Sequence, residues 1–304
     1  MDEGNPMSHA RAVSLMVLVT LLWSTAGVVS RHFEVAQGFE VTFWRSAFTA
    51  LALSAALTRL RGVALWRGLL QSPRAVWLSG GCWAVMFTAF MLALTMTRVA
   101  NVLVTMAIGP LVTALFARLF LHHRLPVRTW VAIAVAGAGI AWMFGHEVQA
   151  ADARSLLGMV VGLAVPLAAA INFTVLQHVS HGEVAGESQD MLPAVLIGAL
   201  LSSLVTLPLA WPVQTFGHDL VLLAGLGVFQ LALPCLMVVG LTRILPAPEI
   251  ALLGLLEVVF GVLWAWIGAG ESPGPTALTG GMLVLGALVG NELLALHKGA
   301  RTAG

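Results

Sequence analysis

The sequence predicts an all-α integral membrane protein whose ten transmembrane helices form two inverted five-helix repeats around a central cavity. Three observations support this fold class. The chain of 304 residues is 59% hydrophobic and only 10% charged, so it lacks the charged surface that a soluble protein of this size needs. Its apolar stretches are close to the roughly 20 residues that cross a hydrocarbon core of about 30 Å. Two of these stretches also resemble each other in the two halves of the chain.

Ten apolar stretches divide the chain. Backbone polar groups inside a bilayer must be satisfied within the segment, and the alternating pattern of a barrel strand is absent, so we expect every stretch to be a helix. The first has no small-residue cleavage site before Arg31, which predicts a retained helix rather than a signal sequence. The expected spans are 12–30, 40–58, 75–97, 100–121, 128–146, 156–178, 191–211, 219–241, 248–269 and 274–295.

The positive charges are distributed unevenly between the two sides. Positive residues near the ends of spans are retained in the cytoplasm. The opposite side holds only Arg31, Arg98 and Arg154, and Arg45 lies inside the second span. We therefore expect both termini in the cytoplasm. The cytoplasmic side would hold Arg11, Arg59, Arg61, Arg67, Arg74, Arg118, Arg124, Arg128, Arg243, Lys298 and Arg301.

A weak internal repeat relates the two halves. Residues 110–123 align with residues 258–271, and a helix rich in small residues follows each segment. Five spans per half is an odd number, so two consecutive copies must cross the membrane in opposite senses. We predict one repeat over residues 1–150 and an inverted one over 151–304, an arrangement typical of transporters.

Composition also excludes several kinds of chemistry. The only lysine is Lys298, so the chain has no G-x-x-x-x-G-K-[ST] loop for ATP and no lysine inside a span for a Schiff base. A net charge of +1 gives no sign of nucleic-acid binding. Cys82 and Cys235 lie in apolar stretches, where a thiol behaves as a small hydrophobe, and the histidines lack metal-ligand spacing. We expect no disulfide framework, no metal site and no cofactor.

Short motifs spread along the chain carry a family resemblance. They are Leu22-Trp23-Ser24, Trp44-Arg45, Pro110, Leu256-Glu257 and Gly270-Glu271. In order and spacing they resemble the EamA-type members of the drug/metabolite transporter (DMT) superfamily, and within it the YddG-type exporters of aromatic amino acids. The resemblance implies a central cavity between the halves and no ATP requirement. The chain departs from the family pattern at His122-His123, where Gly-Glu is frequent, and at Val258, where proline is frequent.

Glu257 is the most informative single residue. A carboxylate halfway along the ninth span is costly at bilayer depth, so it should face the bundle interior or a wet cavity. It could couple transport to protons, bind a substrate amine, or hold the crossing of the fourth and ninth spans through hydrogen bonds.

Arg45 lies about one and a half turns into the second span. Its side chain could extend to the membrane interface. Alternatively, its guanidinium could face the cavity mouth and bind the carboxylate of a zwitterionic substrate, for which its two parallel donors are suited.

Uncharged polar residues inside the spans are further cavity candidates. Most Ser and Thr side chains bond to their own helix, whereas Asn172 and Gln230 cannot be satisfied so easily. The polar residues of this kind are Ser24, Thr25, Thr88, Asn101, Thr105, Asn172, Thr174, Gln177 and Gln230.

The third span carries an aromatic and methionine face. Such a face is common in helix packing, but flexible methionines beside flat rings also suit a pocket that accepts varied apolar side chains. Trp23 joins this group through its motif. The face consists of Trp83, Met86, Phe87, Phe90 and Met91.

Other classes of membrane protein fit the sequence less well. An intramembrane serine protease needs a Gly-x-Ser-x motif in one span and a histidine in another, and the spans do not offer that pair. A channel needs a filter loop or a ring of charge, which the sequence also lacks. A receptor or scaffold stays open, although short loops leave little surface for a soluble partner.

The resulting hypothesis is a secondary transporter, not an enzyme, in the bacterial inner membrane. It would export small amphipathic metabolites, first of all aromatic and other apolar amino acids, by alternating access without ATP. The alternatives are an exporter of drugs or other metabolites and, less well supported by the motifs, an integral membrane enzyme. Its partners would be the small-molecule substrate and the lipid bilayer, and its oligomeric state stays open. The predicted substrate-binding residues are Trp23, Ser24, Arg45, Trp83, Phe87, Asn101, Asn172, Gln230 and Glu257.

Overall fold

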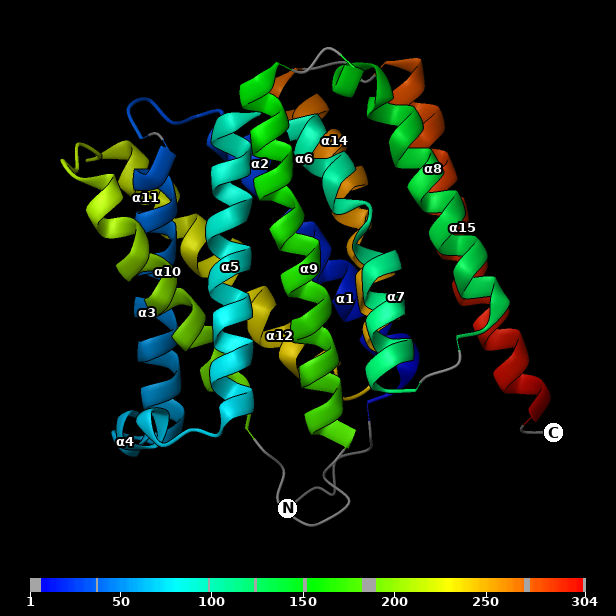
Figure 1. Ribbon diagram of the computed structural model, residues 1–304, viewed down its shortest axis with the longest axis horizontal. Helices are drawn as coiled ribbons and strands as arrows, with labels where there is room; N and C mark the ends of the chain where they lie inside the picture. The colour runs from blue at the N-terminus through cyan, green and yellow to red at the C-terminus, as the bar shows by residue number, and fades with distance from the viewer. Residues whose placement is uncertain are drawn as a thin grey trace.

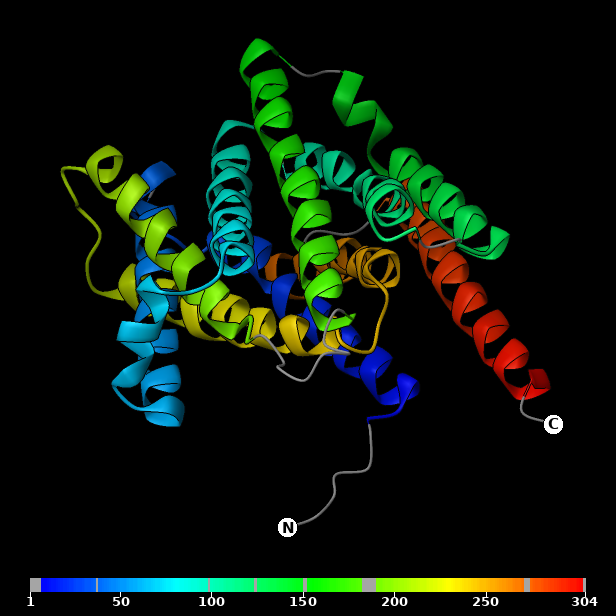
Figure 2. The ribbon, with the colours of Figure 1, turned by 60° about the horizontal axis from the view of Figure 1, so that its bottom comes forward.

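A computed structural model describes residues 7–36, 38–97, 99–122, 125–149, 152–181, 190–270 and 274–302. Within these ranges all regular secondary structure is helical and no strand occurs, so the all-α prediction is confirmed. The helices lie side by side in a single bundle (Figures 1 and 2). In chain order they are α1 (His9–Trp23), α2 (Thr25–Ser30), α3 (Gly38–Arg61), α4 (Ala64–Leu70), α5 (Arg74–Met96), α6 (Val99–Met106), α7 (Gly109–Phe120), α8 (Val127–Gln149), α9 (Ala153–His181), α10 (Leu192–Ala210), α11 (His218–Gly225), the π-helix η2 (Leu226–Ala232), α12 (Leu233–Leu241), α13 (Ala247–Gly254), α14 (Leu256–Ala269) and α15 (Pro275–Thr302).

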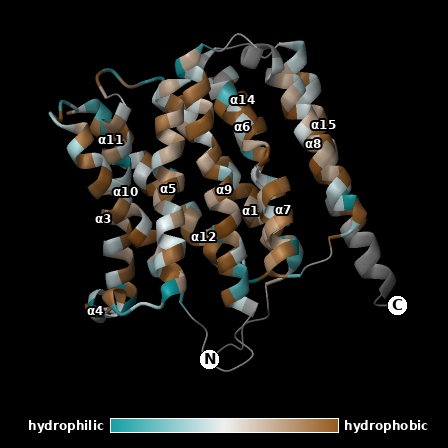
Figure 3. Cartoon of the chain, viewed as in Figure 1, coloured by the Kyte–Doolittle hydropathy of each residue, from teal (hydrophilic) through white to brown (hydrophobic). Residues whose placement is uncertain are grey.

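The expected spans all coincide with helices, but the count of ten stays a prediction. Seven helical segments of the described residues are long and apolar enough to cross a membrane, and α3 with α4, bent by 112°, makes up to eight. α8 and α15 add two apolar stretches of described residues, Val127–Met143 and Pro275–Asn291. Hydrophilic residues gather at the helix ends and apolar residues cover the middle of the bundle (Figure 3), as in a multi-pass membrane protein.

Several of the membrane-spanning segments are interrupted near their midpoints. The first is broken at Ser24, between α1 and α2. The hydroxyls of Ser24 and Thr25 donate to the carbonyls of Leu21 and Leu22, at 2.7 Å each, and hydroxyl bonds of this kind bend a helix.

Three other spans are interrupted, two of them where a new helix begins and one by a π-helix. α6 ends at Met106 and α7 begins with Gly109-Pro110. Proline is tolerated in the first turn of a helix because its missing N–H would be unpaired there in any case. In the second half, α13 gives way to α14 at Leu255, and the π-helix η2 interrupts the span formed by α11 and α12.

The core consists of apolar side chains contributed by both halves. α5 packs along both α9 and α10, and α10 packs along α3. Close approach requires glycine where α5 meets α10, because a Cβ on Gly80 would lie 2.6 Å from Cγ2 of Ile197.

α8 and α15 form an antiparallel pair at the edge of the bundle (Figures 1 and 2). They cross at two glycines, since a Cβ added to Gly139 would lie 2.8 Å from the carbonyl oxygen of Gly280. Thr129 of α8 also donates to Oδ1 of Asn291 of α15, at 3.2 Å. Small residues at the crossing are the usual means of close helix association in membranes.

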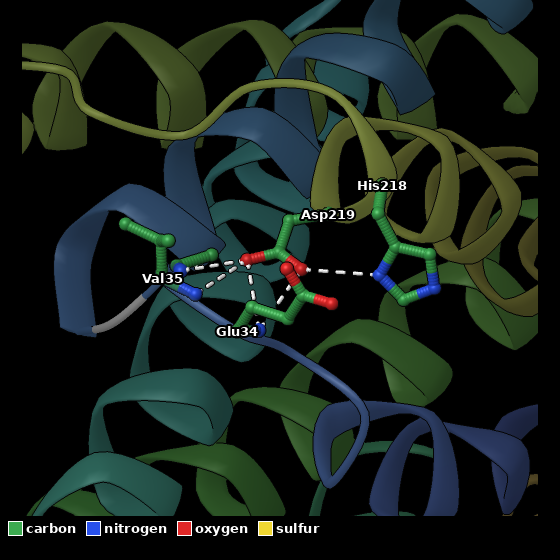
Figure 4. A network of polar contacts seen from close by, with 5 residues as sticks. Glu34, Val35, His218 and Asp219 are labelled. Atoms are coloured by element: carbon green, nitrogen blue, oxygen red, sulfur yellow. Dashed lines mark hydrogen bonds and ion pairs between the residues drawn. The ribbon is translucent and has the colours of Figure 1, made fainter.

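Two buried carboxylates connect the start of α3 with the start of α11. Asp219 of α11 bonds to the loop before α3, and Glu40 of α3 bonds to the segment before α11. Asp219 accepts hydrogen bonds from the backbone N–H groups of Glu34, Val35 and Ala36, at 3.0, 2.8 and 2.9 Å (Figure 4). His218 Nδ1 lies 3.5 Å from Oδ1 of the same carboxylate.

Glu40 makes the reciprocal contact. One of its carboxylate oxygens accepts from the backbone N–H groups of Gln214 and Thr215, at 2.7 and 2.5 Å. We call Glu40 and Asp219 the carboxylate clamp. It fixes the beginning of α3 against the beginning of α11, the two elements that lead to Arg45 and to η2.

Candidate substrate-binding cavity

The interruptions in the helices surround a partly open cavity. We call it the first lobe. Its walls are mostly aromatic, methionine and aliphatic side chains, with three polar residues that can ionise or donate hydrogen bonds from α3, η2 and α14. The lining residues are Trp23, Arg45, Trp83, Met86, Phe87, Phe90, Met106, Val165, Gln230, Leu231, Cys235 and Glu257.

A second lobe, also partly open, adjoins the first. The two lobes share Trp23, Met86, Met106, Val165 and Glu257. The second lobe extends between α7, α9 and α13, where its lining is apolar apart from a single threonine and Glu257. Interrupted helices around a central site are typical of transporters, because irregular backbone is tolerated at membrane depth only where it borders protein or a cavity.

Arg45 lies in the wall of the first lobe and is only 1% exposed. Its Nη1 donates to Oε1 of Gln230 at 3.3 Å, and its Nη2 donates to the carbonyl of Phe87 at 2.9 Å. A buried cation requires such partners to offset the loss of water. The guanidinium therefore belongs to the cavity, and does not extend to the membrane interface.

Gln230 is presented by the π-helix η2. Its Nε2 donates to the carbonyl of Trp23 at 3.2 Å while its oxygen accepts from Arg45. Single π-turns inside α-helices occur frequently at functional sites, because they rotate a side chain out of the regular helical phase. A hydrogen bond from Thr49 to the carbonyl of Gly227, at 2.9 Å, holds this turn against α3.

Glu257 lies on the first turn of α14, directly after the break at Leu255. It borders both lobes. Among the described residues, none makes a hydrogen bond or ion pair with its carboxylate. Arg45 and Glu257 thus face one cavity as separate charges and do not neutralise each other directly.

Two buried donors in the wall of the first lobe have no acceptor. They are Nε of Arg45 and Nε1 of Trp83. A buried donor without a partner is costly, by about 1–3 kcal/mol, and unsatisfied groups of this kind in a native protein call for an explanation. An anionic or carbonyl oxygen of a ligand would satisfy them.

The structure brings six of the predicted binding residues together and places three elsewhere. Trp23, Arg45, Trp83, Phe87, Gln230 and Glu257 all line the first lobe.

Ser24, Asn101 and Asn172 line neither lobe. Ser24 accepts from Nε1 of Trp264 at 3.0 Å, and Asn101 donates to Thr97 at 2.7 Å. Asn172 accepts from Ser79 at 2.6 Å, where α9 packs on α5. A binding role for these three stays a prediction.

Sequence reasoning missed part of the lining. Met86 and Phe90 belong to the aromatic and methionine face of the third span, whereas no pattern in the sequence marks Met106, Val165, Leu231 and Cys235. Met106 is the last residue of α6, so its place in the cavity depends on a break that hydropathy does not reveal. In the sequence, only Pro110 indicates the break between α6 and α7.

Apolar helices bundled around a central, mostly apolar cavity define a multi-pass membrane protein. The model of the EamA-like transporter family matches residues 10–145 and, a second time, residues 156–291. The chain belongs to this family, which is part of the DMT superfamily.

A solved structure described as "Crystal structure of protein" is similar in fold, with a TM-score of 0.75 and 18% sequence identity, over 95% of this chain and 99% of the other. No curated protein matches the sequence.

Proposed function

We propose that the protein is a secondary transporter that exports small amphipathic metabolites, in particular amino acids with aromatic or other apolar side chains. The single observation that carries the proposal is the first lobe, in which the buried Arg45 and the partly exposed Glu257 lie among apolar walls without an ion pair between them. A zwitterion supplies both missing counter-charges at once.

Each part of such a substrate has a matching surface. The carboxylate would lie against Arg45 and Trp83, whose unpartnered donors suit a planar anion. The amine would lie toward Glu257. The apolar side chain would enter the second lobe, since methionine and aromatic walls accept varied shapes.

The mechanism would be alternating access without ATP. The interruptions in the spans around the lobes supply places where half-helices can move while the outer parts stay packed. Three further parts complete the proposal. The direction of transport and the YddG-like substrate range rest on the sequence motifs, and the cytoplasmic position of both termini rests on the distribution of positive charges.

Counterflow in proteoliposomes tests this function. Vesicles loaded with unlabelled phenylalanine should take up labelled phenylalanine saturably, whereas glutamate should not exchange. Arg45→Lys should reduce exchange of phenylalanine about tenfold or more and leave phenethylamine, which has no carboxylate, nearly unchanged, because a lysine retains the charge but loses the two parallel donors.

Thr206→Val is the matched control. It also alters a buried polar residue of a span, but one that lines neither lobe, so the ratio of phenylalanine to phenethylamine exchange should stay that of the wild type. Equal losses of both compounds in Arg45→Lys would indicate a folding defect and contradict the carboxylate assignment. No exchange of any amino acid by folded protein would favour a drug or another metabolite as substrate.

A further inference from the structure

Thr113 differs from the other threonines of the helices. Threonine inside a helix usually donates its hydroxyl hydrogen to a carbonyl three or four residues earlier, and most helical threonines here do so. They are Thr20, Thr25, Thr42, Thr49, Thr95, Thr105, Thr174, Thr206, Thr242 and Thr279.

Thr113 is buried, at 1% exposure, and its hydroxyl has no hydrogen-bond partner. Among the described helical residues it is the one buried threonine of this kind. Its backbone position on α7, just after Gly109-Pro110, would allow the ordinary bond to its own helix, so the missing bond is specific to this site.

The position of Thr113 indicates which part of a bound ligand could contact its hydroxyl. It lines the second lobe and not the first, whereas Arg45 lines the first and not the second. A ligand that occupies both lobes, with its carboxylate at Arg45, therefore brings its far end toward Thr113. The lobe is lined mostly by apolar residues, among them Pro110, Pro166 and Phe173.

A purely structural role would not require a hydroxyl here. Valine has nearly the same shape, and replacing an unpaired buried hydroxyl by a methyl group removes a desolvation cost without removing a bond. The hydroxyl is useful only when something in the lobe can bond to it.

We infer that Thr113 selects substrates whose apolar end carries a hydrogen-bonding atom, such as the indole N–H of tryptophan. The inference rests on the proposed amino-acid transport and adds a substrate preference to it. A bond of this kind changes affinity about threefold to tenfold, since a net hydrogen bond contributes about 0.5–1.5 kcal/mol.

The test compares tryptophan, phenylalanine and 1-methyltryptophan, which has no indole N–H, in counterflow. In the wild type, the KM of tryptophan should be about threefold to tenfold below that of 1-methyltryptophan. Thr113→Val should abolish this difference and leave the KM of phenylalanine within about twofold of the wild type. Thr113→Ser, which restores the hydroxyl, should recover the preference for tryptophan.

Thr105→Val is the matched control, because Thr105 is also buried but donates to its own helix at 2.8 Å and lines neither lobe. It should preserve the preference. A wild-type preference that survives Thr113→Val, or no preference in the wild type, would overturn the role of Thr113. If the wild type exchanges no phenylalanine, the proposed function itself fails, so the two failures are distinguishable.

Discussion

At the scale of single residues, the two charges of the cavity have different surroundings. Arg45 already has a carbonyl and an amide as partners, whereas Glu257 has no hydrogen bond among the described residues. The arginine is therefore fixed in place before a ligand arrives. The carboxylate is available to an amine or to a proton.

Substitution of Glu257 by Gln should separate these roles. If the carboxylate binds the amine, Glu257→Gln should raise the KM of phenylalanine about tenfold and leave 3-phenylpropionate, which has no amine, nearly unaffected. The measurements are counterflow of both compounds and uptake of phenylalanine driven by an imposed pH gradient. An unchanged KM for phenylalanine, together with lost dependence of transport on a pH gradient, would assign Glu257 to proton coupling instead.

At the scale of elements, the contact between α3 and η2 leaves no room for a side chain. A Cβ added to Gly227 would lie 2.8 Å from the carbonyl oxygen of Arg45 and 2.7 Å from Cβ of Phe48. The neighbouring Gly225 has open space around the same position. The two glycines thus form a natural pair for comparison.

Gly227→Ala should lower the melting temperature by several degrees and weaken phenylalanine exchange, because η2 must move away from α3 and carry Gln230 with it. Gly225→Ala should be neutral or slightly stabilising, since alanine favours helix over glycine by about 1 kcal/mol. Thermal unfolding of both variants in detergent, followed by counterflow, checks this. Equal melting temperatures would contradict the close contact.

The elements also show which features the sequence can predict. Helices and their approximate ranges follow from hydropathy, and Arg45 and Glu257 stand out because charge inside a span is costly. The facing direction of Asn172 could not be predicted, because a span is apolar both toward lipid and toward its neighbours, which removes the periodicity that marks a buried face in soluble helices. For the same reason, the π-turn that presents Gln230 leaves no pattern in the sequence.

At the scale of the whole molecule, the carboxylate clamp joins segments that are far apart in the chain. Asp219→Ala would leave three backbone N–H groups without their shared acceptor. We expect a larger fall in melting temperature than for Asp152→Ala, in which an exposed carboxylate loses its bond to one N–H group, that of Ser155, at 2.8 Å.

Thermal unfolding of the two purified variants beside the wild type gives the comparison. Both substitutions remove a carboxylate that accepts hydrogen bonds from backbone N–H groups, so they differ mainly in burial and in the number of bonds lost. A smaller fall for Asp219→Ala than for Asp152→Ala would mean that the clamp contributes little to stability.

The two family matches cover similar segments, yet the segments contribute different charges to the cavity. Arg45 comes from the first and Glu257 from the second. In the alignment of residues 110–123 with 258–271, the position before Pro110 is Gly109, which has no charge to mirror Glu257. The cavity therefore has a cationic group from one segment and an acidic group from the other, although the two segments are related. A zwitterion finds its counter-charges in a single orientation, and reversing that orientation would require exchanging residues between the segments.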